Sequence, residues 1–206
     1  MRITTAIPGP ARPAAAKPKN EIEPLLDTLC SEPAGYFEKR ALRKAALKLG
    51  PENVRKLVDG GVHIHLIEPG EGGPSLRAEY LPRRKLLAVG TQRFTVDNLL
   101  HEMGHALDDL AEPDGAEPVL KSERDQKLGA LYEDYRSRVE ALPWWKRLFR
   151  LDMWSDYATS NVHEYLAEGV MYYTRSERSQ ERLRREDQGL CSYVEGFLLG
   201  PSAQGR

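Results

Sequence analysis

The sequence predicts an α+β fold with a small sheet and a predominantly helical remainder. Segments with helical periodicity and stop signals flank a short central region of alternating β-branched and polar residues. This order of helices, strands and helices is typical of the α+β class. The 206 residues suit one domain with a tail. We therefore expect residues 21–206 to form a single domain and residues 1–20 to form a disordered tail rich in proline and alanine.

The first elements are predicted to be helices. Residues 21–30 form a short helical segment, and a better one extends from Tyr36 to Gly50, where Gly50 and Pro51 give a stop signal. A third short helix starts at Pro51 and is closed by two glycines.

The central region is predicted to form the sheet. Val62 to Glu68 alternates apolar residues with histidine, which indicates a strand. Residues 76–81 and 85–90 are separated by Pro-Arg-Arg and favour a hairpin or two short strands.

The rest of the chain is predicted to be helical. Expected helices extend from Thr95, a candidate N-cap, to about Leu110; from Val119 to Leu142; from Asn161 to Tyr173, with Ser160 as candidate N-cap; and onward to about Asp187.

Composition excludes several classes of protein. The 30 Lys and Arg residues nearly balance the 31 Asp and Glu residues, giving a net charge of -1. A nucleic-acid partner is therefore not expected, because it requires a basic face. No run reaches the ~18–20 apolar residues of a membrane-spanning helix, so we expect a soluble protein without a transmembrane segment. The sequence leaves the oligomeric state open.

The first twenty residues do not have the pattern of a secretory signal. Pro8, Pro10 and Pro13 interrupt any apolar stretch, so we expect no cleaved signal peptide. A disordered terminus is the main interpretation, and an address for a secretion route without cleavage is the alternative.

The motif that carries chemistry is HExxH, formed by His101, Glu102 and His105. Residues four apart share one face of a helix, so both imidazoles can reach one ion. Glu102 lies beside the first histidine, placed to contact water at the ion. A surface helix that carries two histidines by coincidence is the alternative, and the many apolar neighbours of the motif argue against it.

A catalytic zinc site needs a third protein ligand and an open position. The helix expected from Asn161 to Tyr173 offers three candidates, His163, Glu164 and Glu168. Spacing alone does not choose among them.

Two stretches of the sequence resemble a known family. They are HEMGHALDDLAE, residues 101–112, and YATSNVHEYLAEGV, residues 157–170. Together they look like the catalytic domain of anthrax toxin lethal factor and, more loosely, like the bacterial Pro-Pro endopeptidases. The resemblance implies a zincin-like metalloprotease domain that binds one Zn2+ ion.

The resemblance also implies a role for each residue of the site. It makes Glu164 the third metal ligand beside His101 and His105, because the run EYLAE takes the place of the family's glutamate segment. Tyr157 matches a family tyrosine and is expected to donate a hydrogen bond to the developing oxyanion. Glu102 is expected to take a proton from the attacking water and pass it to the leaving amine.

Other residues leave two interpretations each. Asp108 and Asp109 either orient a histidine or form a solvated helix end. His63 and His65 form a rival metal site, are exposed, or line a groove where an extended substrate pairs with a sheet edge. The stretch from Trp144 to Arg150 is expected to be a packed aromatic cluster, with contact to an anionic membrane or a partner as the alternative.

Three functions follow from these observations. The leading hypothesis is a zinc metallopeptidase that acts on a protein or peptide substrate as a secreted or host-delivered effector or toxin, with a cytoplasmic enzyme as the alternative. A zincin-fold binding domain that keeps zinc without cleavage is the second, and an intact Glu102 argues against it because binding has no use for a general base. The third is a metal-dependent hydrolase of another bond, such as an amide in a cell-wall component.

Overall fold

The computed structural model describes residues 18–67, 77–90, 94–111, 120–148, 155 and 157–200. The predicted tail lies outside the described residues as far as residue 17. Helix α1 begins at Pro18, slightly before the predicted domain boundary.

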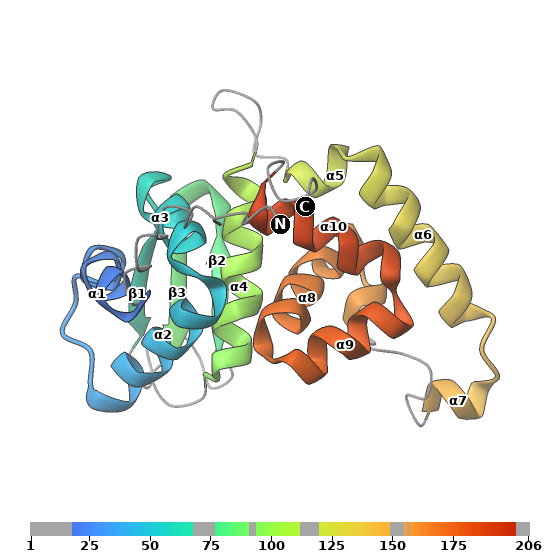
Figure 1. Cartoon of the computed structure of the whole chain (residues 1–206), viewed down its shortest axis with the longest axis horizontal. Coiled ribbons are helices and arrows are strands. Elements are labelled where there is room, and N and C mark those ends of the chain that lie inside the picture. Colours follow the sequence, from blue (N-terminus) through green and yellow to red (C-terminus); the bar gives the residue numbers. More distant parts are fainter. Residues whose placement is uncertain are drawn as a thin grey trace, which may run out of the picture.

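The N-terminal part combines three helices with the sheet and ends in the helix that carries HExxH (Figure 1). Its elements are α1 (Pro18–Leu29), α2 (Tyr36–Leu49), α3 (Pro51–Asp59), β1 (His63–Ile67), β2 (Ala78–Leu81), the 3-10 turn η1 (Pro82–Arg84), β3 (Leu86–Gly90) and α4 (Val96–Asp109).

The C-terminal part is helical in the residues that the structure describes. Its elements are α5 (Lys121–Arg124), α6 (Gln126–Glu140), α7 (Trp144–Leu148), the 3-10 turn η2 (Tyr157–Thr159), α8 (Val162–Arg175), α9 (Glu177–Glu186) and α10 (Gln188–Leu199).

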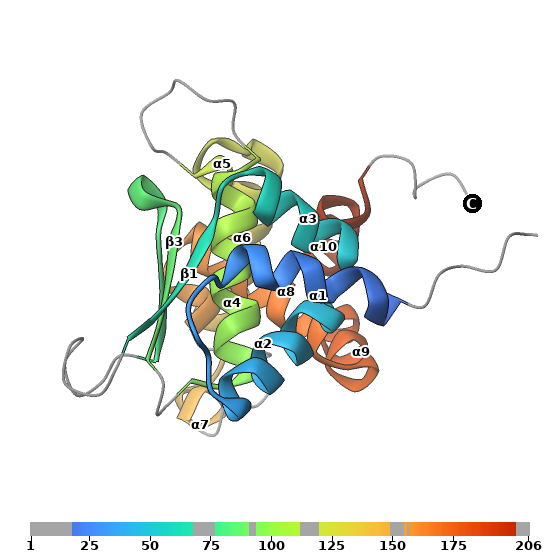
Figure 2. The same ribbon diagram turned by 90° about the vertical axis from the view of Figure 1, so that its left-hand side faces the viewer.

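The sheet has the strand order β1-β3-β2, with β1 parallel and β2 antiparallel to β3. The predicted hairpin of β2 and β3 is therefore confirmed. Figure 2 shows the helices on one side of this sheet, and the burial of β1 agrees, because Ile64 and Leu66 are buried while His63 and His65 are exposed. Strand β2 is an edge strand, and α4 packs against it.

Helix α4 lies between the sheet and the C-terminal helices, as Figure 1 shows. Thr95 caps it as predicted, in a capping box with Asn98. Its other side packs closely against α8 at Gly104, where a Cβ atom would lie 3.2 Å from the Cα of Ala167 and 3.3 Å from the Cβ of Val170. Gly104 lies between the two histidines of HExxH, and its lack of a side chain lets α4 and α8 approach closely at this point.

Three predictions about the later helices need correction. The expected helix from Val119 to Leu142 is broken at Asp125, whose backbone is extended and whose side chain caps α6 by accepting from the Leu128 N–H. Asn161, not Ser160, caps α8. The helical region continues beyond Asp187 as helix α10, and Asp187 is the N-cap of that helix.

Within the described residues, no helix combines the length and the apolar character that crossing a bilayer requires.

Candidate metal centre

Helix α4 presents both histidines of HExxH to its packing partner α8. His101 and His105 are buried, each only 9% exposed, and their Nε2 atoms lie 3.1 Å apart. This is the geometry expected of side chains one helical turn apart.

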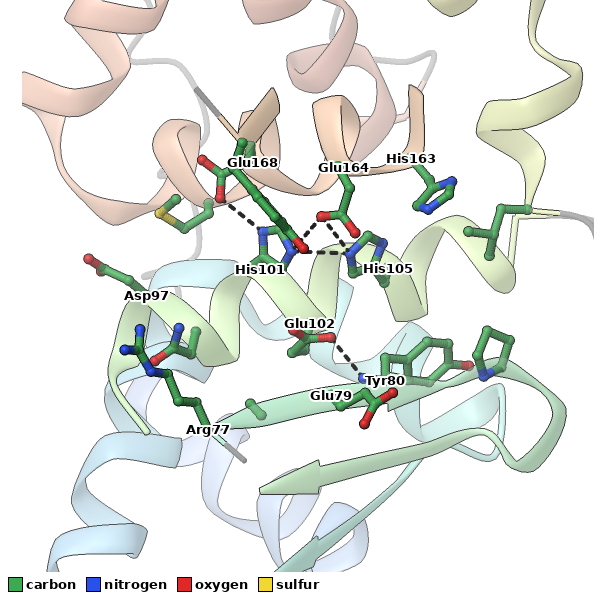
Figure 3. Close-up of a pocket in the computed structure, with 16 residues that line it drawn as sticks. Arg77, Glu79, Tyr80, Asp97, His101, Glu102, His105, His163, Glu164 and Glu168 are labelled. Atoms are coloured by element: carbon green, nitrogen blue, oxygen red, sulfur yellow. Dashed lines mark hydrogen bonds and ion pairs between the residues drawn. The ribbon is translucent and has the colours of Figure 1, made fainter. Parts of the chain in front are cut away.

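Helix α8 brings Glu164 to the same point. Asn161 caps the helix by accepting from the Glu164 N–H at 2.8 Å, which fixes Glu164 in the first turn. Its Oε2 lies 3.0 Å from the Nε2 of His101 and 3.4 Å from the Nε2 of His105. Figure 3 shows the carboxylate of Glu164 above the two imidazoles.

The structure separates the three candidates for a third ligand. Glu164 converges on the imidazoles. His163 lies beside His105, with ring centroids 5.8 Å apart, and its Nδ1 is 3.5 Å from Glu123 on α5. Glu168 lies on the far side of His101, where its Oε1 is 3.1 Å from the Nδ1 of the imidazole.

The three converging atoms suit a tetrahedral metal ion. Ligands at the usual zinc distances lie ~3.4 Å from one another, close to the spacing of the His101, His105 and Glu164 atoms. Oε2 of Glu164 is buried and has no hydrogen bond of acceptable geometry among the described residues. A cation between the three atoms satisfies this oxygen. Among the described residues, this is the one group of three or more side chains able to hold a metal ion.

Electrostatics support the same interpretation. Burial alone would lower the pKa of His101, but the carboxylates of Glu164 and Glu168 raise it to about 9. Burial would raise the pKa of Glu164, yet the two imidazoles outweigh it and lower this pKa. Without a metal ion, a proton on His101 therefore balances the buried carboxylates, and an incoming divalent cation has to displace that proton.

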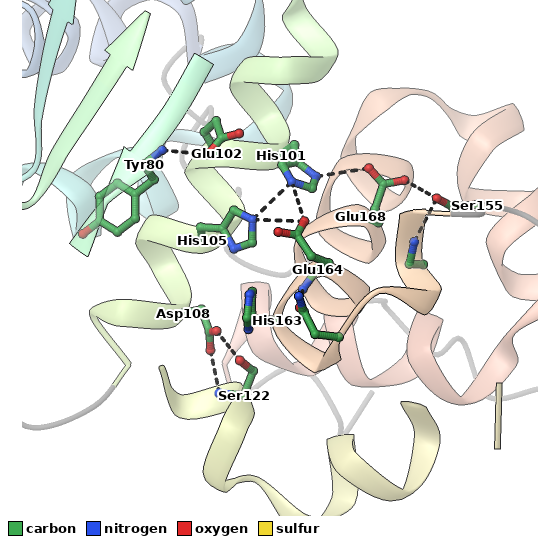
Figure 4. Close-up of polar contacts among 12 residues, drawn as sticks. Tyr80, His101, Glu102, His105, Asp108, Ser122, Ser155, His163, Glu164 and Glu168 are labelled. Atoms are coloured by element: carbon green, nitrogen blue, oxygen red, sulfur yellow. Dashed lines mark hydrogen bonds and ion pairs between the residues drawn. The ribbon is translucent and has the colours of Figure 1, made fainter. Parts of the chain in front are cut away.

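Glu168 contacts the Nδ1 side of the His101 imidazole, opposite Glu164. While its Oε1 faces the imidazole, its Oε2 accepts a hydrogen bond of 2.6 Å from the hydroxyl of Ser155, which in turn accepts from the Ala158 N–H (Figure 4). The contact of Oε1 with Nδ1 is an ion pair, since Nδ1 has no hydrogen bond of acceptable geometry among the described residues. A carboxylate beside Nδ1 favours a proton on that atom and so the tautomer that leaves Nε2 free to bind metal.

Glu102 faces away from Glu164, toward the sheet. Its Oε2 accepts a hydrogen bond of 2.8 Å from the backbone N–H of Tyr80 on β2. Burial raises the pKa of Glu102, which favours a carboxylate that can take up a proton.

Tyr157 lies at the mouth of the site. It is 54% exposed, and its ring centroid is 5.9 Å from that of His101. The charge of Glu164 and partial burial raise the pKa of Tyr157, so its hydroxyl remains a donor.

A cleft of about 920 Å3 opens onto these side chains. Residues of β2 line one wall, including Ala78 and Tyr80, and α4 and α8 line the others. The proposed catalytic groups thus face a space next to a sheet edge.

The two aspartates after the motif, Asp108 and Asp109, form hydrogen bonds with residues other than the histidines. Asp108 is 1% exposed and accepts from the N–H and the hydroxyl of Ser122, which joins α5 to α4. Asp109 accepts from the hydroxyl of Tyr80 at 2.6 Å. The interpretation of a solvated helix end is therefore wrong for Asp108.

The strand histidines lie outside the cleft lining. His63 and His65 are on the exposed face of β1, and Nδ1 of His65 is 2.5 Å from Glu32. The interpretation of His63 and His65 as exposed residues is therefore confirmed. The sheet edge at the cleft belongs to β2, so the alternative of a groove lined by these histidines is wrong. The packed aromatic cluster is also wrong for two of its members, because Trp144 and Trp145 are 70% and 43% exposed.

Sequence reasoning missed Tyr80 and Ser155. Both act through contacts between residues distant in the chain, and neither belongs to a motif. Tyr80 gave a local signal only as an aromatic residue in a predicted strand.

Comparison with solved structures places the fold. The structure of the Pro-Pro endopeptidase PPEP-2 from Paenibacillus alvei superimposes with a TM-score of 0.57 and 17% sequence identity, over 83% of this chain and 98% of that one. This similarity confirms the α+β fold and agrees with the looser of the two resemblances in the sequence. No protein-family model matches the chain. No curated protein matches it either.

Proposed function

We propose that the protein is a zinc-dependent metalloendopeptidase with His101, His105 and Glu164 as metal ligands. The observation that carries the proposal is the convergence of the Nε2 atoms of His101 and His105 with a buried Glu164 oxygen that has no hydrogen bond of acceptable geometry among the described residues. These atoms lie beside a cleft that also holds Glu102. The fold shared with a Pro-Pro endopeptidase supports a peptide as the substrate. One bound ion is expected, since the described residues offer one such group.

The substrate is proposed to bind as an extended strand along β2. In the antiparallel pair, the Arg77 carbonyl accepts from the Gly90 N–H, so Arg77, Glu79 and Leu81 direct their backbone groups to β3. The alternate residues, Ala78 and Tyr80, direct theirs to the outer edge. That edge belongs to the cleft wall. Because the Tyr80 N–H bonds to Glu102, the backbone groups of Ala78 and the carbonyl of Tyr80 remain to pair with a peptide backbone.

The chain's own residues then divide the work of hydrolysis. When bound, zinc supplies a Lewis acid that polarises the scissile carbonyl and acidifies water. Glu102 takes a proton from the attacking water at its carboxylate and delivers it to the leaving amine. Tyr157 donates its hydroxyl proton in a hydrogen bond to the carbonyl oxygen as charge builds there. Glu168 keeps the His101 imidazole in the required tautomer.

Cleavage profiling on a peptide library tests the proposal. Wild type and Glu102→Ala are compared, each with and without a chelator, and Glu181→Ala on α9 serves as a control because that glutamate is exposed. We expect wild type and the control to cleave only without chelator. Glu102→Ala should lose cleavage while keeping about one zinc per chain.

Two other results would redirect the assignment. Cleavage that persists in Glu102→Ala would contradict the role of this residue as general base. Zinc binding without cleavage of any peptide by the wild type would favour the binding domain or a hydrolase of another bond.

A further inference from the structure

Tyr80 joins the edge strand to the catalytic helix at two points. Its backbone N–H donates to Oε2 of Glu102 at 2.8 Å, and its hydroxyl donates to Oδ2 of Asp109 at 2.6 Å. The tyrosine is only 7% exposed. Glu102 and Asp109 are seven positions apart, so they lie on the same face of α4. One residue of β2 therefore contacts two positions of α4 that are two turns apart. Figure 3 shows Tyr80 beside Glu102, next to the candidate metal centre.

The strand register explains why this N–H is available. Tyr80 lies opposite Leu87 in the antiparallel pair, and because Arg77 bonds to Gly90, the Tyr80 position is one that does not bond to β3. An edge N–H without a strand partner normally faces water. Here it meets a carboxylate.

The hydrogen bond from the Tyr80 hydroxyl to Asp109 persists over a wide pH range. Burial and the neighbouring Asp109 both raise the pKa of the Tyr80 phenol, so the hydroxyl stays protonated and continues to donate. A hydrogen bond from a phenol to a carboxylate is stronger than one between neutral groups. This bond fixes the position of β2 relative to α4.

We infer that Tyr80, anchored by Asp109, is a positioning residue for the general base. Its N–H holds Oε2 of Glu102, and this leaves Oε1 as the oxygen that takes the proton. The inference rests on the proposed function for its catalytic consequence. Without the phenol contact, we expect β2 to move relative to α4. Glu102 then adopts orientations in which Oε1 does not face the attacking water.

Kinetics of Tyr80→Phe test the inference, because this variant removes the hydroxyl and keeps the ring and the backbone N–H. We expect kcat to fall about tenfold, with KM within twofold and zinc content unchanged. Asp109→Ala should lose as much as Tyr80→Phe, and the double variant should lose no more than either. Asp109→Asn keeps an acceptor and should recover most of the activity.

Tyr193→Phe is the matched control. Tyr193 on α10 donates to Oδ2 of Asp125, the N-cap residue of α6, at 2.7 Å. This bond is of the same kind and lies away from the cleft. Its loss should lower thermal stability and leave kcat unchanged. Equal losses of kcat in the Tyr80 and Tyr193 variants, or additive losses in the double variant, would overturn the inference.

Hydrogen exchange at the Tyr80 amide gives a second readout that needs no activity. We expect protection in the wild type, and weaker protection in Glu102→Ala and Tyr80→Phe but not in Tyr193→Phe. An amide whose exchange is the same with and without the Glu102 carboxylate would refute the inference, whatever the enzyme assay gives. If the wild type cleaves nothing and the exchange pattern holds, the proposed function fails and the positioning contact stands.

Discussion

At the scale of single residues, the site depends on partly buried carboxylates, each with its own compensating contact. Glu164 faces two imidazoles, Glu168 faces an imidazole and a hydroxyl, and Glu102 accepts a backbone N–H. These differences in environment fit the separate roles that we propose for these chemically identical groups, as ligand, support and base.

Asp108 gives a pH prediction that does not involve the metal. Burial raises its pKa to about 6, although Ser122 opposes the shift. A carboxyl with a raised pKa adds stability below its unfolded pKa of about 3.9 and loses that stability as pH rises through about 6. In the metal-free protein, Asp108→Asn should therefore gain stability relative to wild type over this range, by up to about 3 kcal/mol at neutral pH.

Urea denaturation of both proteins from about pH 4 to pH 7 measures this difference. The asparagine keeps an acceptor for the Ser122 N–H and offers its amide to the Ser122 hydroxyl. If the wild type is the more stable protein at pH 7, the ionised Asp108 is stabilising and this account of its burial is wrong.

At the scale of elements, the close approach of α4 and α8 sets where Glu164 can reach. Gly104→Ala introduces a Cβ against backbone and Cβ atoms of α8, and overpacking of this kind costs about 1–3 kcal/mol. We expect the helices to separate by a few tenths of an ångström and zinc affinity to fall about tenfold. Competition with a chromogenic chelator measures the affinity.

Gly129→Ala is the control for helix propensity. Gly129 lies inside α6, and a Cβ there meets nothing within 4 Å. This variant should gain up to about 1 kcal/mol of stability and bind zinc as the wild type does. Equal zinc affinity in both variants would show that the packing at Gly104 does not position the ligands.

The elements also show what the sequence could predict. HExxH is local, so the shared face of the two histidines followed from their spacing, and the helix and its cap followed from Thr95 and the stop signal near Leu110. The choice of Glu164 came from resemblance, because Glu164 and Glu168 are equivalent in helical spacing and only tertiary packing distinguishes their sides of His101. Asp108 and the break at Asp125 were misjudged for the same reason, since their partners lie on other elements.

At the scale of the whole molecule, the candidate centre connects its two parts. His101 and His105 lie on α4, the last element of the N-terminal part, and Glu164 lies on α8 in the C-terminal part. Figure 1 shows these two helices beside each other. A ligand that binds only the folded state stabilises it by mass action, about 4 kcal/mol at a thousand times its Kd.

Delivery as an effector or toxin stays a prediction from the sequence resemblance.

Removing zinc should therefore destabilise the entire chain. For a protein of this size, about 4 kcal/mol corresponds to a fall in Tm of about 8–16 °C. Calorimetry with and without chelator measures the shift, and Glu164→Gln should show almost none. A wild-type Tm that does not respond to the chelator would argue against an ion bridging α4 and α8.

Anomalous diffraction from crystals of the zinc-loaded wild type, recorded at the zinc absorption edge, tests the metal centre most directly. We expect one strong peak within about 2.0–2.2 Å of Nε2 of His101, Nε2 of His105 and Oε2 of Glu164. A peak at other side chains, or a peak at the two histidines with the Glu164 carboxylate turned away, would contradict the account.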